Sequence, residues 1–121
     1  MIENLNGIHE TVKYKENSNV KLFINVEVED YPIHWHTPME IIMPLEGSYT
    51  VQIGDDLVHL NESDIIFIAS GVKHRLIAPD TGKRLILQIE WSAVSKIKEL
   101  NSILTLIAVS YTHLTLPTKL E

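Results

Sequence analysis

The segment Ile33-His34-Trp35-His36-Thr37-Pro38-Met39-Glu40 determines how the rest of the chain is interpreted. Within it, His34, His36 and Glu40 have the same parity, so on an extended strand all three side chains point to one face. Two imidazoles and a carboxylate that converge suit a first-row divalent metal such as Fe, Mn, Ni or Zn, and an open side leaves positions for water or substrate. Pro38 can bulge such a strand, and the parity argument then fails.

A fourth ligand is expected from another part of the chain, and His74 is the candidate. It follows the turn Ser70-Gly71 at the start of a further predicted strand. A single histidine is more often a surface residue or a hydrogen-bonded core residue. Three residues at strand-compatible spacing, with a fourth after a turn, instead predict one pocket that contains His34, His36, Glu40 and His74.

The sequence around this segment is typical of a mainly β protein. From residue 20 to 28, apolar residues at the even positions alternate with mostly polar residues at the odd positions, which predicts a half-buried strand. Further short strands are expected at 40–45, 49–53, 56–60, 64–69, 74–78 and 84–91, and turn residues separate them. Seven or so short strands with regular turns favour a β-sandwich or a small barrel.

The pattern changes after the last of these strands. Val94, Ile97 and Leu104 recur at helical spacing and Ser92 is available as an N-cap, so one C-terminal helix is expected at 92–108. Residues 109–121 resemble one reading frame of a transposon-derived adapter used in sequencing libraries, and we expect this tail to be non-native. A genuine polar C-terminal strand is the alternative, because threonines alternate with apolar residues there.

Length and composition limit the classes of function. The 121 residues suffice for one domain, and 16 acidic against 10 basic side chains give a formal charge of −6, so this segment has no net attraction to nucleic acid or anionic lipid. With no cysteine, disulfides, thiolate nucleophiles and cysteine-based zinc sites are excluded. Neither a secretory signal nor a membrane span is expected, and we predict a cytoplasmic protein.

The motif residues resemble those of the cupins. His34, His36, Glu40 and Gly47 match the first cupin motif, in which Val28 replaces a glycine. Gly71 and His74 match the second motif, where Ser63, Ala69 and Ala78 replace its other glycine, its proline and its asparagine. The resemblance covers residues 20–91. It implies a small double-stranded β-helix, or jelly-roll, barrel with a metal set of His34, His36, Glu40 and His74.

A narrower resemblance is to the N-terminal sensing domain of AraC-type transcriptional regulators, and it rests on segments 34–42, 45–47, 64–68, 71–74 and 85–91. It implies a non-enzymatic barrel that binds a small effector such as a sugar, with the same four residues lining the effector pocket and no required metal. It also implies a homodimer that binds DNA only through a C-terminal helix-turn-helix domain missing from this chain. The expected organisation is an N-terminal arm at 1–19, which could act as a lid, a cupin barrel at 20–91, a helix at 92–108 that begins the dimerisation region, and the tail.

Two other functions are compatible with the sequence. One is a stand-alone metal-dependent cupin enzyme, such as a dioxygenase, an isomerase or a lyase, in which the four residues hold the ion. No further acid or base can be assigned to such an enzyme from the sequence. The other is a carbohydrate-binding or storage-type barrel with a vestigial pocket.

Overall fold

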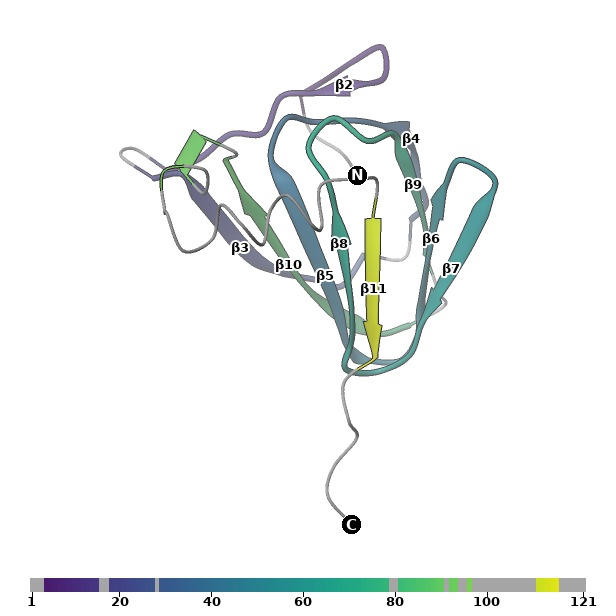
Figure 1. The fold of residues 1–121 in the computed structure, drawn as a ribbon. Coiled ribbons are helices and arrows are strands. Elements are labelled where there is room, and N and C mark those ends of the chain that lie inside the picture. The colour runs from purple at the N-terminus through teal and green to yellow at the C-terminus, as the bar shows by residue number, and fades with distance from the viewer. Residues whose placement is uncertain are drawn as a thin grey trace.

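A computed structural model describes residues 4–15, 18–27, 29–78, 81–90, 92–93, 96 and 111–115. Most of the described chain consists of strands, joined by turns and loops (Figure 1). Their bounds are β1 Leu5–Asn6, β2 His9–Glu10, β3 Val20–Asn25, β4 Tyr31–His34, β5 Met39–Glu46, β6 Tyr49–Ile53, β7 Asp56–Leu60, β8 Asp64–Ile68, β9 His74–Ile77, β10 Lys83–Ile89 and β11 Tyr111–Thr115.

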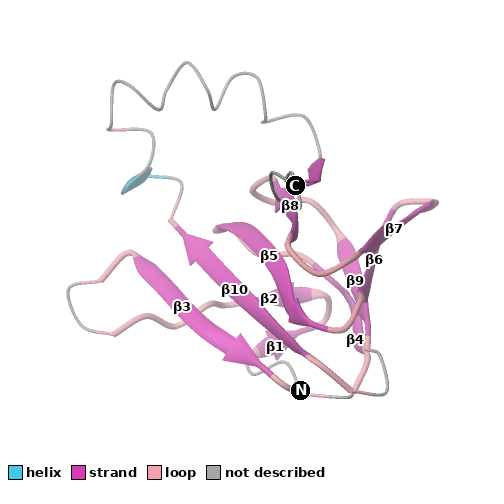
Figure 2. Ribbon diagram, turned by 90° about the horizontal axis from the view of Figure 1, so that it is seen from below, coloured by secondary structure: helices cyan, strands magenta, loops and turns pink. Residues whose placement is uncertain are grey.

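Two antiparallel sheets form the barrel. The larger sheet has the order β11-β8-β5-β10-β3 and the smaller has the order β4-β9-β6-β7, while β1 and β2 form a separate hairpin. The two layers are visible from below in Figure 2. The mainly β, cupin-like barrel predicted from the sequence is therefore confirmed. The predicted helix at 92–108 falls almost wholly outside the described residues.

The apolar core lies between the sheets. The larger sheet contributes residues such as Ile42, Ile66 and Ile86, and the smaller sheet contributes residues such as Val51 and Leu76, each of them 2% exposed or less. Burial of one such side chain stabilises the fold by roughly 1.5–3 kcal/mol. The core therefore holds the two sheets at a fixed separation, and the residues at the sheet junctions keep fixed positions.

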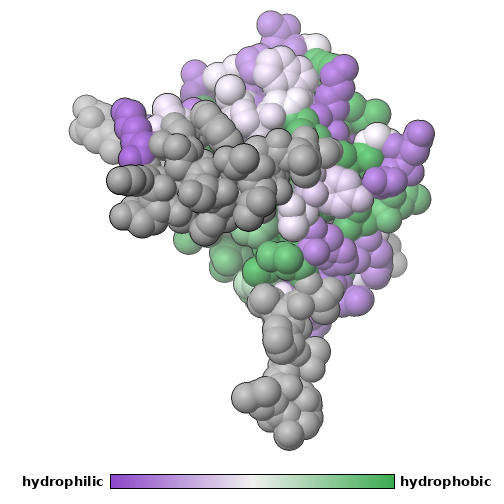
Figure 3. Space-filling view, in the orientation of Figure 1, coloured by the Kyte–Doolittle hydropathy of each residue, from purple (hydrophilic) through white to green (hydrophobic). Residues whose placement is uncertain are grey.

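The prediction for β3 had the correct period but the wrong face. Leu22, Ile24 and Val26 are 60%, 57% and 57% exposed, whereas Asn25 is buried and Phe23 packs against the core. The inner face of β3 borders the cavity as well as the core, so Lys21, Phe23 and Asn25 point inward and the aliphatic residues point outward. Apolar side chains are likewise visible between hydrophilic ones on the surface of the barrel in Figure 3.

The N-terminal arm contacts the barrel at the histidine-rich segment. The backbone N–H of Trp35 donates to the Ile8 carbonyl at 2.8 Å, and the Glu10 N–H donates to the Trp35 carbonyl at 2.9 Å. The His9 ring stacks on Trp35 with ring centroids 4.2 Å apart. Trp35 is half-buried and packs against the N-terminal arm.

At the other end of the chain, residues 111–115 form β11, which pairs antiparallel with β8 from Tyr111 opposite Ile68 to Thr115 opposite Asp64. This matches the strand alternative for the tail. Its non-native origin stays a prediction, because alternating threonine and apolar residues favour a strand whatever their source. No helix in the described part of the chain is long and apolar enough to cross a membrane.

Candidate functional site

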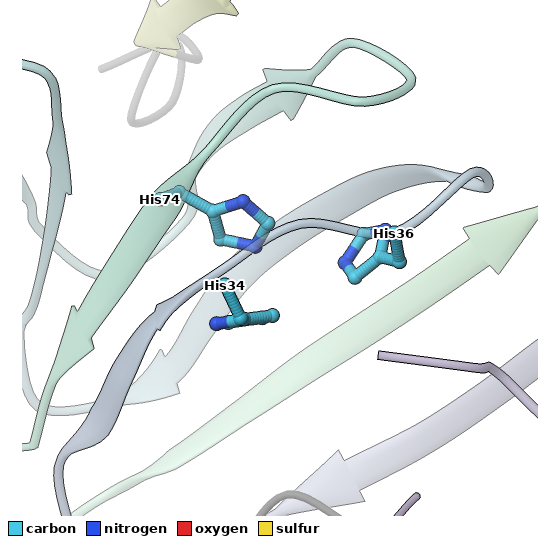
Figure 4. A group of neighbouring side chains, drawn as sticks. All are labelled: His34, His36 and His74. Atoms are coloured by element: carbon cyan, nitrogen blue, oxygen red, sulfur yellow. The ribbon is translucent and has the colours of Figure 1, made fainter. Parts of the chain in front are cut away.

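The four predicted residues meet at one junction between the two sheets. His34 ends β4, His74 begins β9 directly opposite it, and Glu40 lies in β5 of the other sheet. His36 lies in the corner between β4 and β5. All four are buried, with exposures of 1–3%. Figure 4 shows the three imidazoles grouped together.

The convergence has a different cause from the one predicted. The extended strand breaks after Trp35, and Thr37 and Pro38 form a bend before β5 begins at Met39. A common face of one strand therefore does not align the side chains. They meet because the chain crosses from one sheet to the other between His34 and Glu40, and proline at this bend is consistent with the break.

The Nδ1 atoms of the three histidines all face backbone carbonyl oxygens. The distances are 2.8 Å from His34 to Pro32, 2.9 Å from His36 to Pro38 and 2.9 Å from His74 to Val72. A carbonyl oxygen only accepts hydrogen bonds, so each Nδ1 carries the proton. In the neutral ring, Nε2 is then unprotonated and carries a free lone pair. A metal ion requires this tautomer of a histidine that binds through Nε2.

These lone pairs are directed at one another and at Glu40. One ligand atom from each histidine lies within 4.8 Å of the other two. The Glu40 oxygens are 3.3 Å from His36 Nε2 and 3.4 Å from His74 Nε2. These two ring nitrogens and Glu40 Oε2 are buried without a hydrogen-bond partner among the described residues. Buried polar atoms in this condition are destabilising unless a ligand or a proton satisfies them.

The residues present therefore fit a divalent metal ion. An ion with bonds of about 2.1 Å spans ligand atoms up to about 4.2 Å apart, so the rings need to close by only about half an ångström. His34, His36, His74 and Glu40 would hold the ion, and imidazole with carboxylate suits first-row metals. When bound, such an ion supplies Lewis acidity or a position for a small ligand.

The surroundings of the site shift the pKa values of His34 and His36 in opposite directions. Burial, with a contribution from the nearby His74, lowers the pKa of His34 to about 4. Burial also opposes protonation of His36, but the adjacent Glu40 outweighs it and raises the pKa of His36. Burial alone would raise the pKa of Glu40, yet His36 and His74 together hold that pKa well below its ordinary value. The site thus contains one carboxylate that stays ionised and one imidazole that stays neutral at pH 7.

Two further residues at the site were not predicted from the sequence. The Gln88 side chain in β10 is 4% exposed, and its Nε2 donates to Glu40 Oε1 at 2.7 Å. Glu10, in the N-terminal arm, places Oε1 3.7 Å from His34 Nε2. Gln88 had a detectable signal, because it shares the parity of Ile86 and lies within the apolar run 85–89. Glu10 had none.

A cavity of about 190 Å³ adjoins this cluster. It is smaller than the roughly 300–1,000 Å³ typical of sites for drug-sized ligands, so it suits a small metabolite. The arm and the barrel both contribute to its walls, which consist of Asn4, Glu10, Thr11, Lys13, Lys21, Phe23, Glu27, Tyr31, His34, Glu40, Leu76, Ile86 and Gln88.

The remaining histidines lie outside this cluster. His59 in β7 contacts Thr50, with Nδ1 and Oγ1 3.2 Å apart. His113 in β11 lies 3.5 Å from Asp64, and His9 stacks on Trp35. Among the described residues, one group of three or more potential ligands has metal-binding spacing, and it consists of His34, His36 and His74.

The fold and the site together define a small antiparallel β barrel with a buried cluster of three histidines and a glutamate at the junction of its sheets. The chain belongs to the cupins: a family model described as Cupin domain matches residues 23–89, more than half of the chain. This range includes all four predicted site residues and Gln88, and it excludes Glu10.

One curated relative is an uncharacterized helix-turn-helix-type transcriptional regulator, YdeC, from Bacillus subtilis (strain 168). It is 34% identical over 55 residues, which cover 45% of this chain and 19% of the relative. The chain thus matches about a fifth of that regulator's length.

Solved cupin structures resemble the fold. A cupin-2 domain protein from Shewanella frigidimarina is 19% identical, with a TM-score of 0.56 over 63% of this chain and 76% of its own. The DMSP lyase DddQ from Ruegeria pomeroyi is 23% identical, with a TM-score of 0.53 over 60% of this chain and 39% of its own. At these identities the likeness concerns the fold alone.

Proposed function

We propose that this chain is the effector-sensing cupin domain of an AraC-type transcriptional regulator. The observation that carries the proposal is the cavity between the arm and the barrel, whose walls include the buried side chains of His34, Glu40 and Gln88. The match to part of a helix-turn-helix-type regulator supports the same function. The acidic charge of −6 is also consistent with DNA binding by a separate domain.

The cavity favours a small polar effector, such as a sugar. The buried carbonyl oxygen of Gln88 has no hydrogen-bond partner in the described structure, and Lys21 and Tyr31 supply donors. Phe23 and Leu76 provide apolar surface against which a sugar ring can pack. An effector can shift the equilibrium between two conformations of the regulator only by as much as its affinities for those two conformations differ. We also propose a homodimer that acts in the cytoplasm.

Effector binding can be tested directly on the 121-residue chain. Thermal unfolding in the presence of single monosaccharides and related small polyols is expected to reveal a stabilising compound, by about 2.7 kcal/mol at a hundredfold excess over Kd. Lys21→Met should reduce the stabilisation, because Lys21 lines the cavity. Lys83→Met is the matched control, because Lys83 is half exposed and pairs with Glu46. A series in which no compound stabilises the chain contradicts a sugar effector.

The regulator itself is tested by the gene. Determination of the genomic sequence beyond codon 108 is expected to show coding sequence for two helix-turn-helix units. An early stop codon there would contradict the regulator and favour a stand-alone cupin.

A metal-dependent enzyme is the second candidate, and the three free Nε2 lone pairs beside Glu40 favour it. Turnover of a candidate substrate by metal-loaded protein, lost in His74→Ala, would support the enzyme. Retention of effector binding in metal-free His74→Ala would support the sensor instead.

A further inference from the structure

The arm residue Glu10 is placed against the histidine cluster by contacts that belong to the arm itself. The Glu10 N–H and the Trp35 carbonyl are hydrogen-bonded at 2.9 Å, and Trp35 lies between His34 and His36 in the sequence. The hairpin of β1 and β2 is therefore fixed to the segment that carries two of the imidazoles. The Glu10 side chain is largely buried, with 15% of its surface exposed.

The Glu10 carboxylate has few partners for a buried charge. Within the described chain it forms one ion pair, at 3.7 Å from His34 Nε2. Because His34 Nδ1 already faces the Pro32 carbonyl at 2.8 Å, Nε2 is the unprotonated nitrogen of the neutral ring. A lone pair therefore faces a carboxylate, and this contact is unfavourable unless a cation or a proton lies between the two atoms.

The charges in the cluster are matched by a dication. Glu10 and Glu40 are two carboxylates, and donation from Nδ1 leaves the Nε2 of each histidine available to an ion when the ring is neutral. A divalent ion would balance the charge of the two carboxylates. Lys21 also attracts Glu10 and lines the same cavity.

Glu10 lies within reach of an ion held by His34, while the ligand atoms that are all mutually close in the described chain belong to the three histidines. Ligands on one ion with bonds of about 2.1 Å lie up to about 4.2 Å apart. The Glu10–His34 distance of 3.7 Å, the Glu40–His36 distance of 3.3 Å and the Glu40–His74 distance of 3.4 Å all lie within this limit.

We propose that Glu10 is an additional ligand of the candidate metal centre, supplied by the N-terminal arm, and that a bound first-row divalent ion fastens the arm to the barrel. The proposal rests on the fit of a metal to the cluster and not on the identity of an effector. It makes the closure of the cavity depend on metal, because Asn4, Glu10, Thr11 and Lys13 form the arm side of its wall.

The proposal is tested by metal affinity. The 121-residue chain, Glu10→Gln and Glu46→Gln are titrated with Co²⁺ and with Zn²⁺ against a chromophoric chelator. Glu46→Gln removes the same charge from a side chain that is 65% exposed and lies at the opposite end of β5 from Glu40. Glu10→Gln is expected to bind each ion at least tenfold more weakly than the parent chain, and Glu46→Gln within twofold of it.

Hydrogen exchange supplies a second readout. In the parent chain, Zn²⁺ is expected to slow exchange of the Glu10 and Trp35 amides, which form the arm–barrel hydrogen bonds. In Glu10→Gln, saturating Zn²⁺ should leave the exchange rates of these amides unchanged. Circular dichroism of the metal-free variants checks that each one is folded.

Several results would overturn the proposal. Equal affinities of Glu10→Gln and the parent chain exclude a ligand role and leave Glu10 as a structural residue of the arm. Metal-induced protection of the arm that persists in Glu10→Gln excludes the fastening role. A parent chain that binds neither ion excludes the metal centre altogether, while the effector sensor, which is tested by sugar binding and by the gene, stands independently.

Discussion

Gln88 offers a sharp test of how the barrel orients its carboxylate. It is 4% exposed, and its Nε2 donates to Glu40 Oε1 at 2.7 Å, so Gln88→Met removes one hydrogen bond to a charged group at nearly constant volume. A hydrogen bond of this kind contributes about 1.5–3 kcal/mol, which corresponds to a factor of roughly 10–150 in an equilibrium constant. We therefore expect the dissociation constant for Zn²⁺ to rise about 10- to 100-fold, because Glu40 loses the partner that fixes its orientation.

The stability of the metal-free chain should change much less. The Gln88 carbonyl oxygen is buried without a hydrogen-bond partner in the described structure, so methionine also removes an unfavourable group. Chelator competition measures the affinity and urea unfolding measures the stability. Gln52→Met is the control, because Gln52 donates to the Gly54 carbonyl at 3.2 Å in a hairpin of the smaller sheet. A Gln88→Met affinity within twofold of the parent chain, or an equal loss in Gln52→Met, would refute the reasoning.

Three further predictions concern stability. Gly82→Ala should lower the free energy of unfolding by more than about 2 kcal/mol, because φ is +129° and the added Cβ would lie 2.5 Å from a backbone oxygen at the end of β5. Gly71→Ala, with open space around its Cβ, should lower it by about 1 kcal/mol. Equal losses of stability in urea unfolding would contradict the steric argument. Ile66→Ala should destabilise the fold by about 2–5 kcal/mol, because Ile66 is fully buried. Leu22→Ala, at a 60% exposed site in β3, should change stability by under about 1 kcal/mol. A larger loss of stability in Leu22→Ala than in Ile66→Ala would disprove the assigned face of β3. Folding lowers the pKa of His34 from 6.5 to about 4, so the contribution of His34 to the stability of the metal-free chain is complete above pH 6.5 and is lost as the pH falls toward 4, by about 3 kcal/mol in total. In His34→Asn, the urea midpoint should depend less on pH over this window. An unchanged pH dependence of the midpoint would exclude His34 as the titrating group.

The strands and the four-residue cluster were predictable because their signals are local. Alternation identified most strand segments within a residue or two, and the spacing of His34, His36 and Glu40 identified a site. The face of β3 was not predictable from alternation, because the period of a strand says which residues share a face and not what lies opposite that face. Glu10 was not predictable either, since its position depends on hydrogen bonds between β2 and Trp35, which are distant in sequence.

The error at β3 points to the functional site. A barrel strand turns its aliphatic face to the core where the interior is packed with side chains. In β3, however, Phe23 and Lys21 line a cavity, and Asn25 is buried and hydrogen-bonded to Tyr31. The neighbouring β10 follows the same rule, because Gln88 occupies an inward position and contacts Glu40. The interior is therefore divided into an apolar part, which holds the sheets together, and a polar part, which adjoins the histidines. Polar residues at inward positions on two adjacent strands are costly for stability without a ligand, and they mark the side of the barrel where a ligand is expected to bind.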